Sequence, residues 1–241
     1  MPTGSEIGHV AVVPPREVTN VPPLDPQWLE LFAGASASDV SDAVGALYTM
    51  SAGIGPLYRP TPHLLGRALT VKCWPGDNLA IYGALDRVTD GDVLVVDTRG
   101  YTGNCGSGAN VLSAPRAKGL RGVVIDGAWR DVDDLAELGF PMFGRGWSPF
   151  SPAKRRPGEI NVPVHCGGVV VHPGDLVVGD GAGVAVVPSA YISTVWDALA
   201  YRRDNHKDAD SATEAAARGR GDAFDAAFEN AHGVRVSWPA D

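Results

Sequence analysis

The stretch GDVLVVD (91–97) decides the fold class of this chain, because it joins a tight turn to a run of apolar residues. Such a run, Val93–Asp97, is typical of a strand that is buried on both faces of a sheet. Predicted strands and helices alternate on both sides of it. The strands are Ala68–Cys73, Val93–Asp97, Gly122–Asp126 and Pro141–Gly144, and the helices are Asp77–Leu85, Ala109–Lys118 and Val132–Leu138. This alternation predicts an α/β fold with a parallel βαβαβ core.

The two ends of the chain have other patterns. Repeated prolines predict an extended arm over residues 1–26, followed by a helix after Pro26 and a second helix after Ser38. Residues 27–188 form the predicted α/β domain, in which short strands replace helices after Pro163. These strands are Val164–Cys166, Val169–Val171, Leu176–Val178 and Val184–Val187.

The pattern of residues 189–241 predicts a helical tail. Ile192, Val195, Trp196 and Leu199 have helical spacing, and a charged break over Arg202–Asp210 precedes an Ala-rich helix over Ala212–Ala231. Two roles remain open for this tail: packing on a neighbouring subunit or closing its own domain.

Composition excludes several classes of protein. The 241 residues include 28 acidic and 20 basic side chains, so the net charge of −8 argues against a nucleic-acid partner. The hydrophobic fraction of 44% excludes wholesale disorder. No apolar run approaches the roughly 18 residues of a membrane span, and the first residues lack signal-peptide features. The three cysteines lack CxxC spacing, so we expect a cytoplasmic protein without disulfides or structural zinc.

Glycine accounts for 30 residues, about 12% of the chain against a usual share of roughly 7%. Several glycines lie in TRGYTGNCGSGAN (98–110), between a predicted buried strand and a predicted helix. Three interpretations remain open for this loop. Its backbone N–H groups could bind a carboxylate, it could be a tight turn only, or it could bind a nucleotide with Asp126 as the ribose ligand. Its GxxGxG order differs from the dinucleotide fingerprint GxGxxG.

Arg130 and Asp131 follow the next predicted strand, at the edge of the sheet where α/β proteins bind ligands. The pair has a structural interpretation, with Asp131 as a helix N-cap and Arg130 in a surface ion pair. It also has a functional one, in which Asp131 holds a hard divalent cation while Arg130 binds a carboxylate or oxyanion.

Other polar residues have more ordinary interpretations. His165 and His172 are poor joint ligands, and Cys105 is expected to be a small buried filler. Asp77-Asn78 is expected to cap a helix, and Asp97 is either a turn former or a support for the site. Arg145, Trp147 and the cluster Lys154-Arg155-Arg156 either bind a distal substrate carboxylate or belong to a solvated loop.

Several segments together resemble the RraA-like family. They are GRALTVKCWPGDNLAIYGAL (66–85), GDVLVVD (91–97), AKGLRGVVIDGAWRD (117–131), GFPMFGRGWSP (139–149) and NVPVHCGGVVVHPGDLVVGDGAGVAVVP (161–188). The resemblance covers roughly residues 36–188. The family contains class II aldolases that act on 4-hydroxy-4-methyl-2-oxoglutarate and 4-carboxy-4-hydroxy-2-oxoadipate, and also the regulator of ribonuclease E activity.

The resemblance implies an α/β/β/α sandwich in a homotrimer or homohexamer, with sites between subunits. It implies that Asp131 is the protein ligand of Mg²⁺ or Mn²⁺, that Arg130 contacts the pyruvate oxygens, and that backbone amides of Gly108, Ala109 and Asn110 hold the pyruvate carboxylate. Many aldolase members have an acidic residue where this chain has Ala109, which puts the particular substrate in doubt more than the chemistry.

We therefore expect a metal-dependent lyase whose substrate is a small 2-oxo acid, with oxaloacetate decarboxylation as a further activity. The lyase would cleave a 4-hydroxy-2-oxo dicarboxylic acid to pyruvate through an enolate, which needs a Schiff base or a metal for its stabilisation. Of four lysines only Lys72 is predicted within a strand and none at a strand end, which disfavours a Schiff base. Two alternatives remain: a non-catalytic trimeric regulator of a ribonuclease, and a sugar-acid lyase or dehydratase on the same scaffold.

Overall fold

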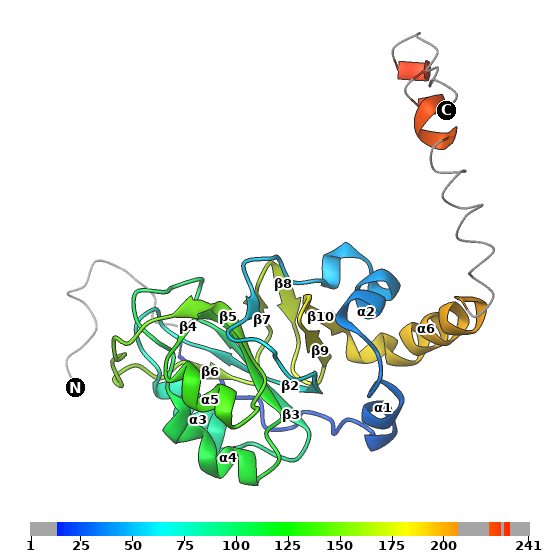
Figure 1. Ribbon diagram of the computed structural model, residues 1–241. Coiled ribbons are helices and arrows are strands. Elements are labelled where there is room, and N and C mark those ends of the chain that lie inside the picture. Colours follow the sequence, from blue (N-terminus) through cyan, green and yellow to red (C-terminus); the bar gives the residue numbers. More distant parts are fainter. Residues whose placement is uncertain (1–13, 207–221, 228, 232–241) are drawn as a thin grey trace. The chain divides into compact units, whose positions relative to one another are not determined.

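Three parallel βαβ units build the centre of an eight-stranded mixed sheet (Figure 1). The computed structural model describes residues 14–206, 222–227 and 229–231. The chain divides into two units, residues 1–196 and 197–241, and the sheet lies in the first. Of the second unit, the end of one helix and residues 222–227 and 229–231 are described, all helical.

The strands are β1 (Gly55–Pro56), β2 (Leu64–Lys72), β3 (Asp92–Asp97), β4 (Gly122–Trp129), β5 (Met142–Trp147), β6 (Glu159–Ile160), β7 (Val164–Cys166), β8 (Val169–Val171), β9 (Leu176–Asp180) and β10 (Gly183–Val187). The helices are α1 (Pro26–Leu31), α2 (Ala37–Val44), α3 (Leu79–Asp86), α4 (Ser113–Ala117), α5 (Val132–Glu137) and α6 (Ile192–His206). Short 3₁₀ helices are η1 (Ala46–Tyr48), η2 (Ala109–Leu112) and η3 (Ser189–Tyr191).

The sheet has the order β1-β5-β4-β3-β2-β9-β10, with β6 paired to β2 beside this path. Strands β2, β3, β4 and β5 are parallel neighbours, whereas β1, β6, β9 and β10 are joined by antiparallel pairing. The hairpin β7–β8 forms a separate two-stranded sheet. The predicted α/β class and the parallel core are therefore confirmed.

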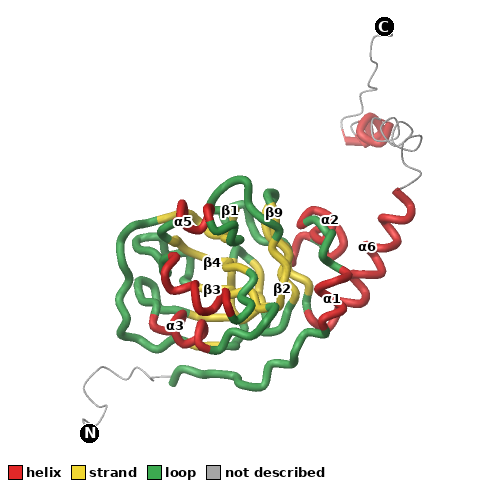
Figure 2. Tube along the Cα trace, turned by 60° about the horizontal axis from the view of Figure 1, so that its bottom comes forward, coloured by secondary structure: helices red, strands yellow, loops and turns green. Residues whose placement is uncertain are grey.

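Strand β3 separates two apolar cores, because its side chains point alternately to the two faces of the sheet. Leu94 and Val96 belong to a core that also contains residues of α3 and α5, and Figure 2 shows these helices in front of β3 and β4. Val93 and Val95 belong to the other core, together with residues of the β7–β8 hairpin. Every residue of β3 is buried, as the apolar run predicts for a strand covered on both faces.

The predicted helix over Ala109–Lys118 is wrong as a single element, because the chain forms η2 and then the five-residue α4. Pro115 lies within α4 and lacks the N–H group that a continuous α-helix would use at this position. The helix predicted after Ser38 is capped by Ser36 instead, whose hydroxyl accepts a hydrogen bond from the Asp39 N–H at 3.0 Å. The break predicted from Arg202 is also displaced, since α6 continues to His206.

Two further segments differ from the predictions in length or coverage. Strand β4 extends past Asp126 to Trp129, because a β-bulge between Ile125 and Ala128 lets pairing with β5 resume. The Ala-rich helix predicted over residues 212–231 lies mostly outside the described residues, of which 222–227 and 229–231 are helical.

The described part of the N-terminal arm is an extended segment that leads to α1 (Figure 2). The N–H of Val18 donates to the carbonyl of Ile160 at 3.1 Å, and the N–H of Ile160 donates to the carbonyl of Arg16 at 3.1 Å. The carboxylate of Asp25 then caps α1 by accepting a hydrogen bond from the Gln27 N–H at 3.0 Å.

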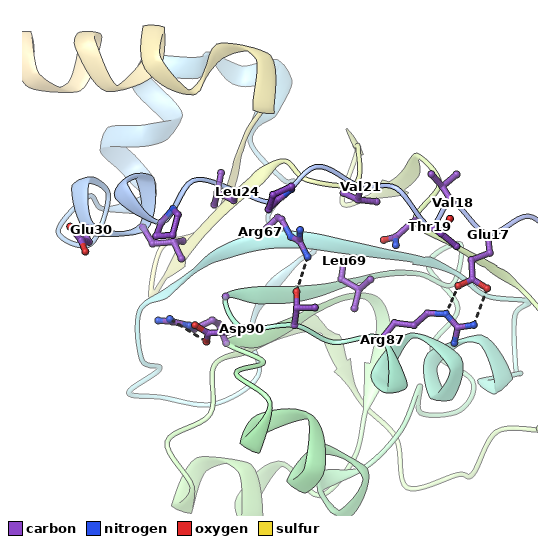
Figure 3. A pocket seen from close by; sticks show the side chains of 17 residues that line it. Glu17, Val18, Thr19, Val21, Leu24, Glu30, Arg67, Leu69, Arg87 and Asp90 are labelled. Carbon is purple, nitrogen blue, oxygen red and sulfur yellow. Dashed lines mark hydrogen bonds and ion pairs between the residues drawn. The ribbon is translucent and has the colours of Figure 1, made fainter.

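A cavity of about 780 Å³ lies between the arm and the sheet (Figure 3). Its arginines already have partners: Arg87 pairs with Glu17, as Figure 3 shows, and Arg121 lies 3.6 Å from Asp90. Arg67 pairs with the buried Asp92, with its Nη2 atom 2.7 Å from the carboxylate. We interpret these pairs as structural, because they consume the charge that a ligand would need.

Candidate functional site

The glycine-rich loop over residues 98–110, called the Gly loop below, follows β3. It meets the turn after β4 at the carboxyl ends of these adjacent parallel strands. The N–H of Gly106 donates to the carbonyl of Ala128 at 2.7 Å, and the N–H of Arg130 donates to the carbonyl of Ser107 at 3.2 Å. These backbone contacts bring the predicted residues Gly108, Asn110, Arg130 and Asp131 together around one cavity. Ala109 does not line this cavity, but its N–H donates to Asp131.

Asp131 has a left-handed backbone conformation with φ 58° and ψ 41°, which only a few residue types other than glycine adopt readily. It occupies the N-cap position of α5, but its side chain makes no capping hydrogen bond to that helix. The Oδ2 atom instead accepts a hydrogen bond from the Ala109 N–H at 3.1 Å. The turn therefore directs the carboxylate towards the Gly loop.

Gly108 is required by this contact for a steric reason. Its φ of −131° is available to any residue, so conformation alone does not select glycine. A Cβ atom at this position, however, would lie 2.1 Å from Asp131 Oδ2 and 2.9 Å from Arg130 Nε. The two charged groups therefore occupy the space that a side chain at position 108 would need.

Arg130 lies beside this carboxylate and is held by the loop that follows β5. One terminal nitrogen, Nη1, donates to the Ser151 hydroxyl at 2.8 Å. The Nε atom is buried, lies 3.6 Å from Asp131 Oδ2, and has no hydrogen-bond partner among the residues that the structure describes. The guanidinium thus keeps donor capacity at the cavity wall.

The cavity has a volume of about 130 Å³, and Asn78 and Tyr82 of the α3 region close its other side. Asn78 is 1% exposed and its Nδ2 atom donates to the Gly106 carbonyl at 2.7 Å. Its Oδ1 atom is buried, with no hydrogen-bond partner in the described part of the chain. A buried polar atom without a partner costs about 1–3 kcal/mol, and such atoms at a cavity favour a polar ligand.

Sequence reasoning missed two polar cavity residues, Tyr82 and Ser151, and two apolar ones, Val111 and Pro152, for which no motif gave a signal. Lys154, named above for either a distal carboxylate or a solvated loop, also lines the cavity, and its Nζ atom lies 4.8 Å from the centre of the Tyr82 ring. The neighbouring loop is fixed by Asp77, whose Oδ2 atom accepts hydrogen bonds from the Arg155 and Arg156 N–H groups at 2.8 and 3.0 Å.

Cys105 lies in the Gly loop and is 1% exposed. Burial raises the pKa of its thiol above the ordinary value, so the thiolate that a nucleophile needs is disfavoured. This agrees with its expected role as a small buried filler.

Asp97 and Asp126 do not belong to this cavity. Asp97 accepts hydrogen bonds from the N–H groups of Arg99 at 2.8 Å and His165 at 3.3 Å, so it forms a turn and also holds a second segment. Asp126 lies within β4, pairs with Arg145 and accepts a hydrogen bond from the Gly167 N–H at 3.1 Å. Because the Asp126 carboxylate faces away from the Gly-loop cavity, the nucleotide interpretation loses its ribose ligand.

The residues at the cavity fit a hard divalent cation with few protein ligands. Asp131 supplies the carboxylate, one-third of its side chain is exposed, and its Oδ1 atom has no hydrogen bond to another described residue. The described residues contain no group of three or more His, Cys, Asp or Glu side chains that could hold a metal ion. Mg²⁺ is commonly bound in this way, through one or two carboxylates with water and substrate oxygens completing the shell.

Comparisons with known proteins point to one family. The model of the RraA-like family, described as Aldolase/RraA, matches residues 37–186. A relative from Halalkalibacterium halodurans, provisionally named 4-hydroxy-4-methyl-2-oxoglutarate aldolase, is 41% identical over 67% of this chain and 76% of its own length.

Two solved structures have the same fold. An uncharacterized protein from Pseudomonas syringae matches with a TM-score of 0.70 and 28% identity, over 82% of this chain and 91% of that chain. Streptomyces coelicolor RraAS2, described as an unusual member of the RNase ES inhibitor RraA family, matches with a TM-score of 0.68 and 28% identity, over 77% of this chain and 96% of that chain. Within the described residues, no helix has the length and apolar character to cross a membrane.

Proposed function

Because the chain belongs to the RraA-like family, we propose that it is an aldolase that cleaves a 4-hydroxy-2-oxo dicarboxylic acid, such as 4-hydroxy-4-methyl-2-oxoglutarate, to pyruvate. The name of the Halalkalibacterium relative supports this substrate class. The observation that carries the proposal is the contact between Asp131 and Ala109, which places a carboxylate and the Arg130 guanidinium at one small cavity.

Arg130 is proposed to bind the 2-oxo acid through guanidinium nitrogens other than Nη1, which donates to Ser151. A guanidinium binds a carboxylate or an oxyanion through directed, charge-assisted hydrogen bonds. Backbone N–H groups of Gly108 and Asn110, at the start of η2, are proposed to add donors, because the first amides of a helix lack partners within it. The Ala109 N–H is already used by Asp131, so its expected role passes to its neighbours.

Asp131 is proposed to hold Mg²⁺ or Mn²⁺ through the oxygen that Ala109 does not contact. Such a cation supplies Lewis-acid stabilisation of the enolate that carbon–carbon cleavage produces. Decarboxylation of oxaloacetate passes through the same pyruvate enolate, so we propose it as a second activity. Lys154 also lines the cavity and is proposed to contact the part of the substrate beyond the pyruvate moiety.

A homotrimer or homohexamer is the assembly we propose. Trp147 is the last residue of β5, Phe150 follows three residues later, and the two are 70% and 68% exposed. The segment that carries them is joined to the Gly loop, since the Cys105 N–H donates to the Phe150 carbonyl at 2.9 Å. Large exposed aromatic side chains are enriched at protein interfaces. Light scattering would then give three or six times the chain mass of 25.2 kDa.

The test is pyruvate release by the purified chain from 4-hydroxy-4-methyl-2-oxoglutarate and from oxaloacetate, with Mg²⁺ or with a chelator. We expect activity that is lost on chelation and restored by Mg²⁺. Activity that persists without divalent metal would contradict the metal-dependent mechanism. Cleavage of a sugar acid but of neither 2-oxo acid would instead support a sugar-acid lyase or dehydratase on this scaffold.

A ribonuclease regulator is the second candidate, favoured by the similarity to the Streptomyces structure and its described inhibitor family. It predicts inhibition of a ribonuclease in a reconstituted cleavage assay, with no turnover of any 2-oxo acid. The Asp131→Asn variant separates the two functions, because the proposed lyase mechanism needs the carboxylate, whereas a non-catalytic regulator is expected to retain its inhibition.

A further inference from the structure

A second polar pocket lies on the face of the sheet opposite the Arg130–Asp131 cavity. Its volume is about 550 Å³, and it shares no lining residue with that cavity. Asp97 and Asp126 form its floor. Each lies two residues after a valine, Val95 or Val124, of the core that packs against the β7–β8 hairpin, so their side chains point to that same face of the sheet. His165 and Val170 of the β7–β8 hairpin form one wall.

Charged residues from four neighbouring strands form a row across this pocket. Lys72 of β2 is in register with Asp97 of β3, and Asp97 is in register with Asp126 of β4. Arg145 of β5 lies beside the β-bulge and pairs with Asp126. The row therefore has a cation at each end and two carboxylates between them.

The two carboxylates are already used by the protein. Each oxygen of Asp97 accepts a backbone hydrogen bond, from Arg99 and from His165. Asp126 accepts hydrogen bonds from Arg145 and from the Gly167 N–H. Both side chains are buried, with residue exposures of 6% and 3%. Because these oxygens hold the surrounding loops, they are poor candidates for metal ligands.

The cations of the pocket keep unused donors. The Arg99 guanidinium has no ion-pair or hydrogen-bond partner within the described residues, and Arg145 uses only its Nε atom in hydrogen bonds there. Lys72 also lines the pocket, while its Nζ atom lies 3.3 Å from Glu159 outside it. Because Lys72 is paired with Glu159, the donors left unused at this pocket by the described residues are those of the Arg99 guanidinium and of Arg145 beyond Nε.

The backbone presents Arg99 to this pocket in a strained conformation. Arg99 has φ 61°, although it is not glycine, and its N–H is fixed by the Asp97 carboxylate. The following N–H, of Gly100, donates to the Asp126 carbonyl at 3.0 Å. Residues held in left-handed conformations cluster at ligand-binding sites, where the surrounding structure enforces them.

We propose that this pocket binds a small dianion, a phosphate monoester or a dicarboxylate, through the guanidinium groups of Arg99 and Arg145. Arginine binds both kinds of oxyanion through paired, charge-assisted hydrogen bonds. The inference goes beyond the proposed aldolase function and is independent of it, because the two cavities share no residues.

The test is calorimetric titration of the full chain with inorganic phosphate and, separately, with malonate. The Arg99→Asn variant removes the cation while asparagine tolerates the left-handed backbone. We expect it to weaken binding roughly tenfold or more, the effect of losing charge-assisted hydrogen bonds. Arg121→Asn is the matched control, since Arg121 is an exposed arginine outside this pocket. Comparison of the two probes distinguishes a phosphate ligand from a dicarboxylate.

A second pair of variants avoids the strained turn. Val170 lines the pocket and is 52% exposed, so Val170→Glu should repel an anion while Val170→Gln should not. The Arg130→Gln variant, which alters the other cavity, should retain binding. The proposal is overturned when neither probe binds at millimolar concentration, when Arg99→Asn and Val170→Glu bind normally, or when Arg130→Gln alone abolishes binding. A change of oligomer mass in Val170→Glu without binding of either probe would also overturn it, by identifying a subunit interface.

Discussion

The carboxylate of Asp131 accepts a hydrogen bond from the backbone N–H of Ala109 at 3.1 Å, across 22 residues of sequence. This contact joins the segments that follow β3 and β4, whose strands are parallel neighbours. It orients Asp131 towards the Gly loop and fixes the first residue of η2. The geometry of the candidate site therefore depends on a contact between a side chain and the backbone of another loop.

Asp131→Asn is expected to abolish most lyase activity while the chain still folds. Asparagine is among the few residues that adopt the left-handed conformation readily, and it retains an acceptor for the Ala109 N–H. It lacks the charge that a divalent cation needs. We expect turnover to fall at least about 100-fold, a typical cost of losing one preorganised electrostatic group, as measured by pyruvate release.

Asp133→Asn is the matched control, because Asp133 is an exposed acid in the first turn of α5, two residues away. It should retain normal turnover. Equal losses in both variants would indicate that helix electrostatics, rather than the Asp131 carboxylate, is the important factor.

Gly108→Ala is expected to reduce activity by displacing the charged pair. The added methyl group would lie 2.1 Å from Asp131 Oδ2, so the carboxylate or the loop must move. Overpacking of this kind costs about 1–3 kcal/mol of stability, and urea unfolding would measure it. Gly34→Ala is the control, since a methyl group added there would meet no atom within 4 Å, and its change should stay within about 0.5 kcal/mol. Normal activity in Gly108→Ala would contradict the steric argument.

The environment of Asp77 leads us to expect that the free energy of unfolding of the chain falls in acid. Burial acts to raise the pKa of its carboxyl, but hydrogen bonds from the N–H groups of Leu79, Arg155 and Arg156 outweigh this and hold the pKa below its ordinary value. The ionised Asp77 carboxylate therefore contributes fully to the free energy of unfolding above the unfolded-state pKa of about 3.9. This contribution is lost as pH falls through the lower pKa of the folded state.

Unfolding free energies measured by urea between pH 7 and pH 3 would test this prediction. Asp77→Asn should lower stability by about 1–3 kcal/mol at pH 7 and flatten the dependence on pH below about pH 4. The same steep acid dependence in the variant and the parent would show that other carboxyl groups are responsible.

The three cysteines are expected to be unreactive in the native protein. All are free and buried. Burial raises the pKa of Cys73 to about 12 and raises the pKa values of Cys105 and Cys166 above their ordinary value. A thiol-specific chromogenic reagent at pH 8 should react slowly with the native chain and label three thiols in urea. Rapid labelling of one native thiol would identify a cysteine that the fold leaves accessible.

The strands could be predicted from the sequence because apolar runs and glycine turns are local signals. The bounds of β7 and β8 agree with the predicted Val164–Cys166 and Val169–Val171. The ends of helices were harder to predict, because neighbouring polar residues compete as caps. Ser36 and Ser38 are both plausible N-caps of α2, and the hydrogen bond from the Asp39 N–H to the Ser36 hydroxyl favours Ser36.

The candidate site could be predicted only in part. Arg130 and Asp131 were identified by their position after a strand, whereas Tyr82 and Ser151 enter the cavity only through tertiary packing. The left-handed conformation of Asp131 has no signature in the sequence, since most such positions are occupied by glycine. The nucleotide interpretation named Asp126 as a ribose ligand, but its side chain lines the other pocket, because the face that a side chain occupies follows from register and not from residue type.

The left-handed turn at Asp131 also constrains how this position can change over evolutionary time. Of the residues that tolerate such a backbone, asparagine and glycine are each one nucleotide substitution away from an aspartate codon. Either change would remove the negative charge and leave the turn intact. A descendant of this chain could thus lose the proposed lyase activity in a single mutation while its fold, and any surface used to bind other proteins, remained under selection.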